Sequence, residues 1–397
     1  MTLLPQSEAE VQAAVADALA RSSTLAVEGL GSKRGLGRPM QAVETLSLRA
    51  LSGIVTYEPE ELILTAQAGT PRDVIEATLA QRGQFLAFEP PDFSALFGSD
   101  SAGTLGGLVA CNLSGPRRFA AGAARDFVLG LRAVSGRGEV FKAGGRVVKN
   151  VTGYDLPKLL TGSHGTLAVL TELTLKVLPA PEETETLVLR GLPDAQALGL
   201  LRGAISLSVE PTGLAHLPGV VAPSLGETSA LTLFRLEGPA PSVKDRSARL
   251  RDWLVAQGAP AVETRDNAPA LWRALRDALP FAGEVRRDDL IWRLSLPPAS
   301  AATVGARLAA LPDVAFFYDW AGGLIWVAAP AALPAASIRD ALQGEGHATL
   351  FRAPDSIRAL MPVFPPQADG VAALSRRIKD QFDPRGILNP GRMEAAP

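Results

Sequence analysis

The chain has 397 residues, 47% hydrophobic and 20% charged, a composition typical of a globular protein with two or three domains. Lys and Arg number 39 against 41 Asp and Glu, a net charge of −2, so nucleic acid and anionic membrane surfaces are set aside as partners. The single cysteine, Cys111, excludes an intramolecular disulfide, a cysteine-ligated iron–sulfur cluster and a multi-cysteine zinc site, and three histidines argue against a histidine-rich metal centre. We therefore expect no metal and assign the difficult chemistry to a bound cofactor.

The sequence carries no membrane signal. Its first residues lack the charged and apolar regions of a secretory signal. The longest apolar stretch, 323–336, is broken by Pro330 and Pro334 and is shorter than the roughly 20 residues that span a bilayer. We expect no transmembrane segment and a cytoplasmic location, with any contact with the inner membrane peripheral and made through partner proteins.

Residues 1–180 alternate strands and helices around glycine-rich loops. Ser7 and Glu10 form a capping box, which predicts a helix after it. A second helix is predicted where Thr70 can act as the N-cap and Pro71 can take the first helical position. Asp155 can act as the N-cap of a short third helix. The strands predicted in this region cover 24–28, 44–48, 54–57, 62–66, 128–134, 139–142 and 166–177.

A change in composition at 179–183 predicts a domain boundary. Beyond it, residues 290–352 read strand, helix, strand, strand, helix, strand, which is the split ferredoxin-like unit. Residues 187–258 look like a looser copy. We expect an antiparallel sheet with helices on one face. A last helix over 371–382 leads into a tail that can fold back onto the first domain.

The loop Gly29–Gly37 follows a strand and contains Ser32, Lys33 and Arg34. Glycines let the backbone approach a ligand closely, and successive amides in such a turn form an anion-binding nest. It is neither the dinucleotide fingerprint, because Arg34 stands where glycine is needed, nor a P-loop. Read alone, a loop of this composition is more often an ordinary surface turn.

A second glycine-rich segment, 101–107, opens a predicted helix that ends near 112–118. The free amides of a helix N-terminus attract phosphate. Further backbone-exposing turns lie at 153–155 and 162–166. Several such turns in one domain indicate a ligand with two phosphates and two ends.

In combination these motifs resemble the flavin-binding domain shared by vanillyl-alcohol oxidase and p-cresol methylhydroxylase (PCMH). The residues that carry the resemblance are 29–37, 104–107, Asn112, 114–115, Asp126, 128–130, 162–167 and 382–391. Two other segments, 148–159 and 346–352, are similar to the FAD-binding E subunits of bacterial glycolate oxidases. The resemblance implies an α+β fold: a two-subdomain PCMH-type FAD-binding domain (1–180), a ferredoxin-like antiparallel cap (181–365) and a C-terminal segment (366–397) that returns to the FAD domain.

The resemblance also implies noncovalent FAD and its contacts. The diphosphate, isoalloxazine, ribose and adenine would be held by Gly29, Gly31, Ser32, Lys33, Gly35, Thr104, Gly106, Gly107, Asn112, Ser114, Gly115, Asp126, Gly165, Thr166, Val169 and Asn389. Covalent members often carry histidine in the first loop, where this chain has Ser32 and Lys33. The cap also lacks the histidine-rich metal motif of catalytic 2-hydroxy-acid dehydrogenases, which puts independent substrate oxidation in doubt.

Three residues are candidates for catalysis, each with a structural alternative. His347 is the candidate base, or a partly buried histidine satisfied by hydrogen bonds. Arg293 lies in an apolar strand and needs a partner, either a substrate carboxylate or a carboxylate such as Asp319. Tyr154 contacts the flavin or is a buried aromatic.

These observations favour an FAD-binding subunit of a glycolate oxidase (glycolate dehydrogenase) complex, which oxidises glycolate to glyoxylate with a second flavin subunit and an iron–sulfur subunit. The lone cysteine agrees with a separate cluster-bearing chain. A self-sufficient FAD-dependent 2-hydroxy-acid dehydrogenase, of the D-lactate type, and a non-catalytic assembly subunit are the alternatives.

Overall fold

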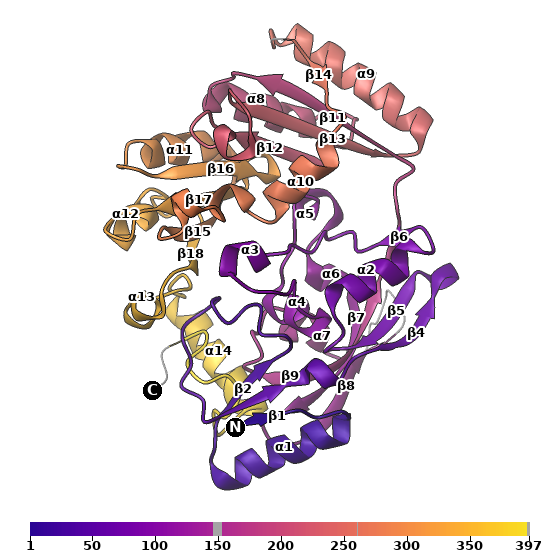
Figure 1. Ribbon diagram of the computed structural model, residues 1–397, viewed down its shortest axis with the longest axis vertical. Helices are drawn as coiled ribbons and strands as arrows, with labels where there is room; N and C mark the ends of the chain where they lie inside the picture. The colour runs from indigo at the N-terminus through magenta and orange to yellow at the C-terminus, as the bar shows by residue number, and fades with distance from the viewer. Residues whose placement is uncertain (146–152, 260, 395–397) are drawn as a thin grey trace. The chain divides into compact units, whose positions relative to one another are not determined.

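The computed structural model describes residues 1–145, 153–259 and 261–394 (Figure 1). The chain forms two compact units. Unit 1 comprises Met1–Ser114, Gly122–Ala180 and Pro354–Pro397, and unit 2 comprises Gly115–Ala121 and Pro181–Ala353. The domain bounds predicted from the sequence differ from these units at two places, because they assign 115–121 to the first domain and 354–365 to the cap.

Unit 1 contains a small parallel sheet with the strand order β1-β3-β2. Helix α1 (Glu8–Arg21) lies between β1 and β2 in the chain, and its Val11, Val15 and Ala18 are buried. The Ser7 hydroxyl accepts from the Glu10 amide at 3.2 Å. The Glu10 carboxylate instead accepts from the amide of Gln6, one residue earlier than a capping box requires. The strands are β1 (Thr2–Leu3), β2 (Leu25–Glu28) and β3 (Glu44–Ser47).

The larger sheet of unit 1 is antiparallel, in the order β4-β5-β9-β7-β8. Helix α2 begins at Arg72 with Pro71 as its N-cap, so the predicted cap at Thr70 is wrong by one residue. The Thr70 hydroxyl instead donates to the Gln67 carbonyl at 2.7 Å and stabilises the turn before the helix. The strands are β4 (Ile54–Glu58), β5 (Ile63–Gln67), β7 (Val128–Ser135), β8 (Val140–Gly144) and β9 (Ala168–Lys176).

Short elements complete unit 1. The C-terminal helix α14 (Asp369–Phe382) leads into a tail in which Leu388 pairs with Leu25 of β2. The Asp155 side chain caps α7, as the sequence predicts, by accepting from the Lys158 amide at 3.2 Å. The other elements are α2 (Arg72–Ala80), β6 (Gln84–Phe85), α3 (Ser94–Phe97), α4 (Leu105–Cys111), α6 (Ala124–Phe127), α7 (Leu156–Leu160), β10 (Leu178–Pro179) and α13 (Asp355–Leu360).

Unit 2 is built on one eight-stranded antiparallel sheet, in the order β14-β11-β13-β12-β16-β17-β15-β18. Each half has the strand, helix, strand, strand, helix, strand order and the 4-1-3-2 pairing of a ferredoxin-like unit, so the looser copy in the sequence is a true structural repeat. The first half is β11 (Glu183–Arg190), α8 (Asp194–Ile205), β12 (Gly213–Leu217), β13 (Leu231–Gly238), α9 (Ala240–Ala256) and β14 (Glu263–Thr264). The second is β15 (Leu290–Ser295), α11 (Ala301–Ala309), β16 (Ala315–Asp319), β17 (Leu324–Ala329), α12 (Ala335–Asp340) and β18 (His347–Arg352).

The two halves meet where β12 pairs with β16, His216 opposite Tyr318. The buried His216 ring contacts Thr232 Oγ1 at 3.0 Å and Asp194 Oδ1 at 3.2 Å. The Tyr318 hydroxyl donates to Asp194 Oδ2 at 2.8 Å. This polar network ties α8 to the sheet at its centre, so His216 has a structural role.

Helices lie on both faces of this sheet, contrary to the expectation of one covered face. On one face, the Tyr318 side chain contacts α8 through Asp194, and the Trp292 ring lies under the Arg339 guanidinium of α12. On the opposite face α10 (Ala268–Arg276) packs through Trp272, whose indole donates to Thr186 Oγ1 at 3.0 Å. The short helix α5 (Arg118–Ala121) also belongs to unit 2. In the described residues, no helix is long and apolar enough to cross a bilayer.

Candidate functional site

A pocket in unit 1 brings four distant segments together. Its empty space, open solvent at the mouth included, is about 810 Å³. The segments are 27–34, 104–111, 164–170 and the tail around Asn389. Residues lining it are Val27, Glu28, Gly29, Leu30, Gly31, Ser32, Lys33, Arg34, Met40, Leu48, Ala68, Thr104, Gly106, Gly107, Ala110, Cys111, His164, Gly165, Ala168, Leu170, Asn389 and Arg392.

The first glycine loop presents free amides. In the described part of the chain, the backbone N–H groups of residues 30–33 donate to no acceptor. Gly31 has φ +73°, a conformation that glycine adopts without strain. Successive unpaired amides form the nest that the sequence predicts, and such a nest binds anions.

Arg392, from the tail, supports this loop. Its guanidinium donates to the Lys33 carbonyl at 2.6 Å and to the Arg34 carbonyl at 3.1 Å. Arg392 thereby holds the loop through its carbonyl oxygens, and the amides of residues 30–33 stay free.

The second glycine segment packs directly against the first. A Cβ on Gly29 would lie 2.3 Å from Thr104 Oγ1, and one on Gly103 would lie 2.4 Å from Lys33 Nζ. Only glycine at these positions allows the loops this approach. The free amides predicted at the start of α4 are wrong, however, because the amides of 105–107 donate to Thr70 O, Ala68 O and Thr104 Oγ1.

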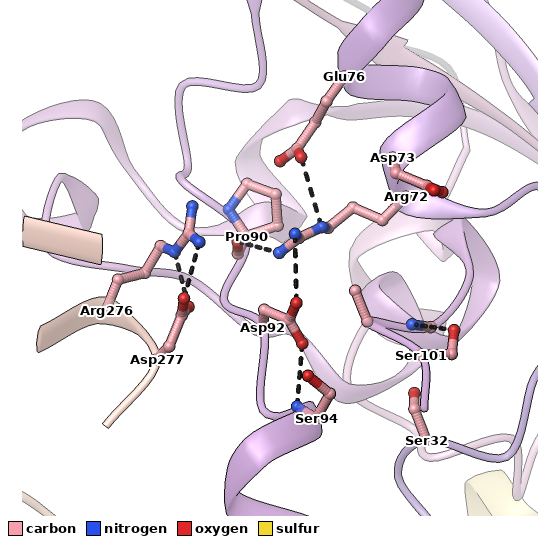
Figure 2. A network of polar contacts seen from close by, with 12 residues as sticks. Ser32, Arg72, Asp73, Glu76, Pro90, Asp92, Ser94, Ser101, Arg276 and Asp277 are labelled. Atoms are coloured by element: carbon pink, nitrogen blue, oxygen red, sulfur yellow. Dashed lines mark hydrogen bonds and ion pairs between the residues drawn. The ribbon is translucent and has the colours of Figure 1, made fainter. Parts of the chain in front are cut away.

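A polar network around Arg72 anchors the second segment (Figure 2). The Arg72 amide donates to the Gly103 carbonyl at 3.0 Å. Its buried guanidinium donates to Pro90 O at 3.1 Å and forms ion pairs with Glu76 at 3.5 Å and Asp92 at 3.6 Å. The network fixes the turn beside Lys33.

Two buried cations line the pocket without carboxylate partners. Lys33 Nζ donates to Ser32 Oγ at 3.1 Å and to Ala102 O at 3.2 Å, and Arg392 donates to loop carbonyls. Among the described residues, neither forms an ion pair. Burial lowers the pKa of both Lys33 and Arg392. Buried positive charge of this kind is stabilised by an anionic ligand.

His164 also borders the pocket and is held neutral. Burial, and then the charge of Arg392, lowers the pKa of His164 to about 4. Its Nδ1 is buried without a hydrogen-bond partner. Burial likewise raises the pKa of the neighbouring Cys111 thiol, which keeps it protonated.

The pocket contains nine of the sixteen predicted cofactor residues: Gly29, Gly31, Ser32, Lys33, Thr104, Gly106, Gly107, Gly165 and Asn389. The other seven do not line it. Four of them accept hydrogen bonds within the protein: Asn112 Oδ1 from Arg125 N, Ser114 Oγ from Ala124 N, Gly115 O from Trp320 Nε1, and Asp126 Oδ2 from Ala123 N. The Thr166 hydroxyl donates to Ser163 O. Gly35 packs on Phe97, and Val169 is buried in β9.

Arg392 and Cys111 line the pocket but are not among the predicted site residues. Arg392 follows Asn389 by three residues and is the last arginine of the chain. A basic residue beside a predicted ligand-binding tail is the signal that could have found it. Cys111, apolar in character and inside a helix, gives no such signal.

Of the catalytic candidates, Tyr154 belongs to unit 1, and Arg293 and His347 belong to unit 2. Tyr154 is 92% exposed, so it is not a buried aromatic, and it does not line the pocket. Arg293 forms no ion pair with Asp319 in the described residues and instead lies over Trp320, with Cζ 5.1 Å from the ring centroid. His347 is exposed on β18, and in the part of the chain that the structure describes its imidazole makes no hydrogen bond. The segment 148–152, part of the resemblance, lies outside the described residues.

The residues of the pocket fit FAD. Its unpaired amides, and its two cations without carboxylate partners among the described residues, match a diphosphate, and its lining from four segments suits an elongated ligand. The family model described as the FAD binding domain matches residues 1–144, and that of the C-terminal domain of FAD-linked oxidases matches residues 367–393.

Relatives cover nearly the whole chain. Glycolate oxidase subunit GlcE of Escherichia coli is 37% identical over 96% of this chain and 95% of its own length. Glycolate oxidase subunit GlcD of Bacillus subtilis is 26% identical over 90% of this chain and 80% of its own. The D-2-hydroxyglutarate dehydrogenase of Xanthomonas citri is 36% identical over 49% of this chain and 40% of its own.

Solved structures share the fold. The 4-ethylphenol oxidase of Gulosibacter chungangensis superposes with a TM-score of 0.74 at 15% identity, over 100% of this chain and 89% of its own. A p-cresol methylhydroxylase superposes with a TM-score of 0.74 at 13% identity, over 100% of this chain and 88% of its own. The expected PCMH-type fold is therefore confirmed, and the chain belongs to the FAD-linked oxidoreductases, in the family of glycolate oxidase subunit GlcE.

Proposed function

We propose that this chain is the FAD-binding subunit of a glycolate oxidase complex, which oxidises glycolate to glyoxylate together with a second flavin subunit and an iron–sulfur subunit. The 37% identity to a glycolate oxidase subunit over 96% of the chain carries the proposal. Unit 1 is the FAD-binding domain and unit 2 the substrate cap.

The chain's own residues hold the cofactor. The amides of 30–33 and the side chains of Lys33 and Arg392 neutralise the diphosphate, while Thr104, Gly106, Gly107, Gly165 and Asn389 line the rest of the pocket. Oxidation of glycolate removes two electrons and two protons, and bound FAD supplies the two-electron acceptor. Because the first loop offers Ser32 and Lys33 rather than histidine, the flavin is bound noncovalently, and acid precipitation releases it from the chain.

The lone cysteine agrees with separate partner subunits. One cysteine cannot ligate an iron–sulfur cluster, so a cluster that accepts electrons from the flavin would belong to another chain. Purified alone, the protein is expected to be yellow and nearly inactive with glycolate. Co-expression with the two partners is expected to restore dye reduction. Robust turnover by the isolated chain would reject the role of a dependent subunit.

The partial similarity to D-2-hydroxyglutarate and D-lactate dehydrogenases favours a second candidate, a self-sufficient 2-hydroxy-acid dehydrogenase. Anaerobic mixing of the isolated protein with a panel of 2-hydroxy acids tests it, because rapid bleaching by one acid supports this activity. An assembly subunit without flavin would instead show no visible flavin absorbance and would not take up added FAD.

A further inference from the structure

Unit 2 holds a group of cations of its own. Two guanidinium groups lie over one indole: Arg118 Cζ is 4.6 Å and Arg293 Cζ is 5.1 Å from the ring centroid of Trp320. The ring is fixed in place, because its Nε1 donates to the Gly115 carbonyl at 3.1 Å. Trp320 is thus a rigid aromatic platform carrying two positive charges.

Arg293 on this platform has no polar partner. In the described residues its guanidinium makes no hydrogen bond and no ion pair, although the residue lies in the centre of a strand. Burial, together with the charge of Arg118, lowers the pKa of Arg293 to about 10, while Asp319 acts in the opposite direction. The Asp319 Oδ1 accepts from the Trp320 amide at 2.7 Å. A guanidinium in this position has its donors available for a ligand.

His347 lies on the same face of the sheet. Arg293 pairs with Thr349 and Ser295 with His347, so alternate side chains of β15 and β18 share this face. Burial, and then the charges of Arg293 and Arg118, lower the pKa of His347. The cations that act on His347 are therefore Arg293 and Arg118, while Asp319 acts on Arg293.

We propose that Arg118 and Arg293 form a binding site for a small monocarboxylate above the Trp320 ring, with His347 at its edge. Planar guanidinium groups match a carboxylate in geometry and charge. The choice of glycolate as the natural carboxylate rests on the proposed function, whereas the binding of the carboxylate group does not.

The three histidines of the chain make this site directly observable. Full-length protein with labelled histidines is titrated by NMR, and His347 is assigned from a His347→Gln variant. Acetate and glycolate are the ligands, and glycolamide, which lacks the negative charge, is the control. We expect both carboxylates to raise the pKa of His347, because a bound anion offsets the two guanidinium charges, and glycolamide to leave it unchanged.

Variants separate the site from the rest of the surface. Arg293→Met and Arg118→Gln are each expected to weaken acetate binding about tenfold or more. The matched control is Arg249→Gln, an exposed arginine of α9 that pairs with Asp245 at 3.1 Å, and its affinity is expected to equal that of the wild type. Equal acetate affinity in all variants, or a His347 pKa that no carboxylate moves, would overturn the site.

The outcome is independent of the proposed function. Flavin content and glycolate oxidation by the reconstituted complex are measured on the same preparations. An active yellow complex whose His347 ignores acetate rejects the carboxylate site alone. Acetate binding in a protein that supports no glycolate oxidation rejects the proposed function alone.

Discussion

Asn389 and His164 are 225 residues apart in the chain, yet Asn389 Nδ2 donates a hydrogen bond of 2.8 Å to the His164 carbonyl. The Oδ1 of the same amide accepts from the Val27 amide at 2.6 Å. Both residues have positive φ, 42° for Asn389 and 52° for His164. The tail thereby connects β2 to the turn before β9, two of the segments that line the pocket.

Asn389→Ala is therefore expected to weaken the pocket as a whole. It leaves the Val27 amide and the His164 carbonyl without partners, at a cost of about 1–3 kcal/mol for each buried group. We expect a lower free energy of unfolding and at least tenfold weaker FAD binding, measured by denaturant titration and flavin fluorescence. Asn267→Ala, at an exposed position that caps nothing, is the control and should change neither quantity.

Arg392→Met tests whether the tail shapes the glycine loop. The substitution removes two charge-assisted hydrogen bonds to loop carbonyls and one cation of the pocket. Each such bond contributes about 1.5–3 kcal/mol, so FAD affinity should fall about ten- to a hundredfold. Arg385→Met, which removes an exposed arginine bonded to Ser22, is the matched control. Unchanged affinity in Arg392→Met would show that the loop holds its shape alone.

Much of the fold could be predicted because the local signals agree with the packing. The order of strands and helices over 290–352 specified a ferredoxin-like half, and Asp155 correctly predicted a helix start. The loop 29–37 was recognised as a ligand-binding turn only together with the glycine-rich segment 101–107, because read alone it is compatible with an ordinary surface turn.

The missed features depend on contacts between distant segments. The amides at the start of α4 are occupied by Ala68 and Thr70, which no local pattern around 105–107 reveals. Helix α10 covers the second face of the sheet through Trp272, a choice set by tertiary packing. Arg392 enters the pocket only because Leu388 pairs with Leu25.

The depressed pKa of His164 predicts a pH dependence of stability. In the folded protein His164 titrates at about 4, against 6.5 for the free side chain. The neutral imidazole contributes its full stabilisation above pH 6.5. As the pH falls, His164 takes up a proton in the unfolded chain before it does so in the folded protein. The contribution of His164 to stability should therefore decrease by roughly 3 kcal/mol as the pH falls from 6.5 to 4.

His164→Gln isolates this contribution. Urea unfolding of the variant and the wild type is compared at several pH values, because the carboxylates that titrate in the same range are common to both. The difference in the free energy of unfolding should shift in favour of the variant as the pH falls from 6.5 to 4. A difference that is constant with pH would contradict the assignment.

The centre of unit 2 depends on a glycine. A Cβ on Gly305 of α11 would lie 1.8 Å from the Tyr318 hydroxyl oxygen, so Gly305→Ala must displace the tyrosine that donates to Asp194. We expect a loss of about 2–4 kcal/mol, since overpacking is added to a broken buried hydrogen bond. Gly199→Ala in α8 meets no atom within 4 Å and should instead stabilise by about 0.5–1 kcal/mol. Denaturant unfolding of both variants measures the contrast. If Gly305→Ala is as stable as Gly199→Ala, the His216–Asp194–Tyr318 network does not hold the two ferredoxin-like halves together.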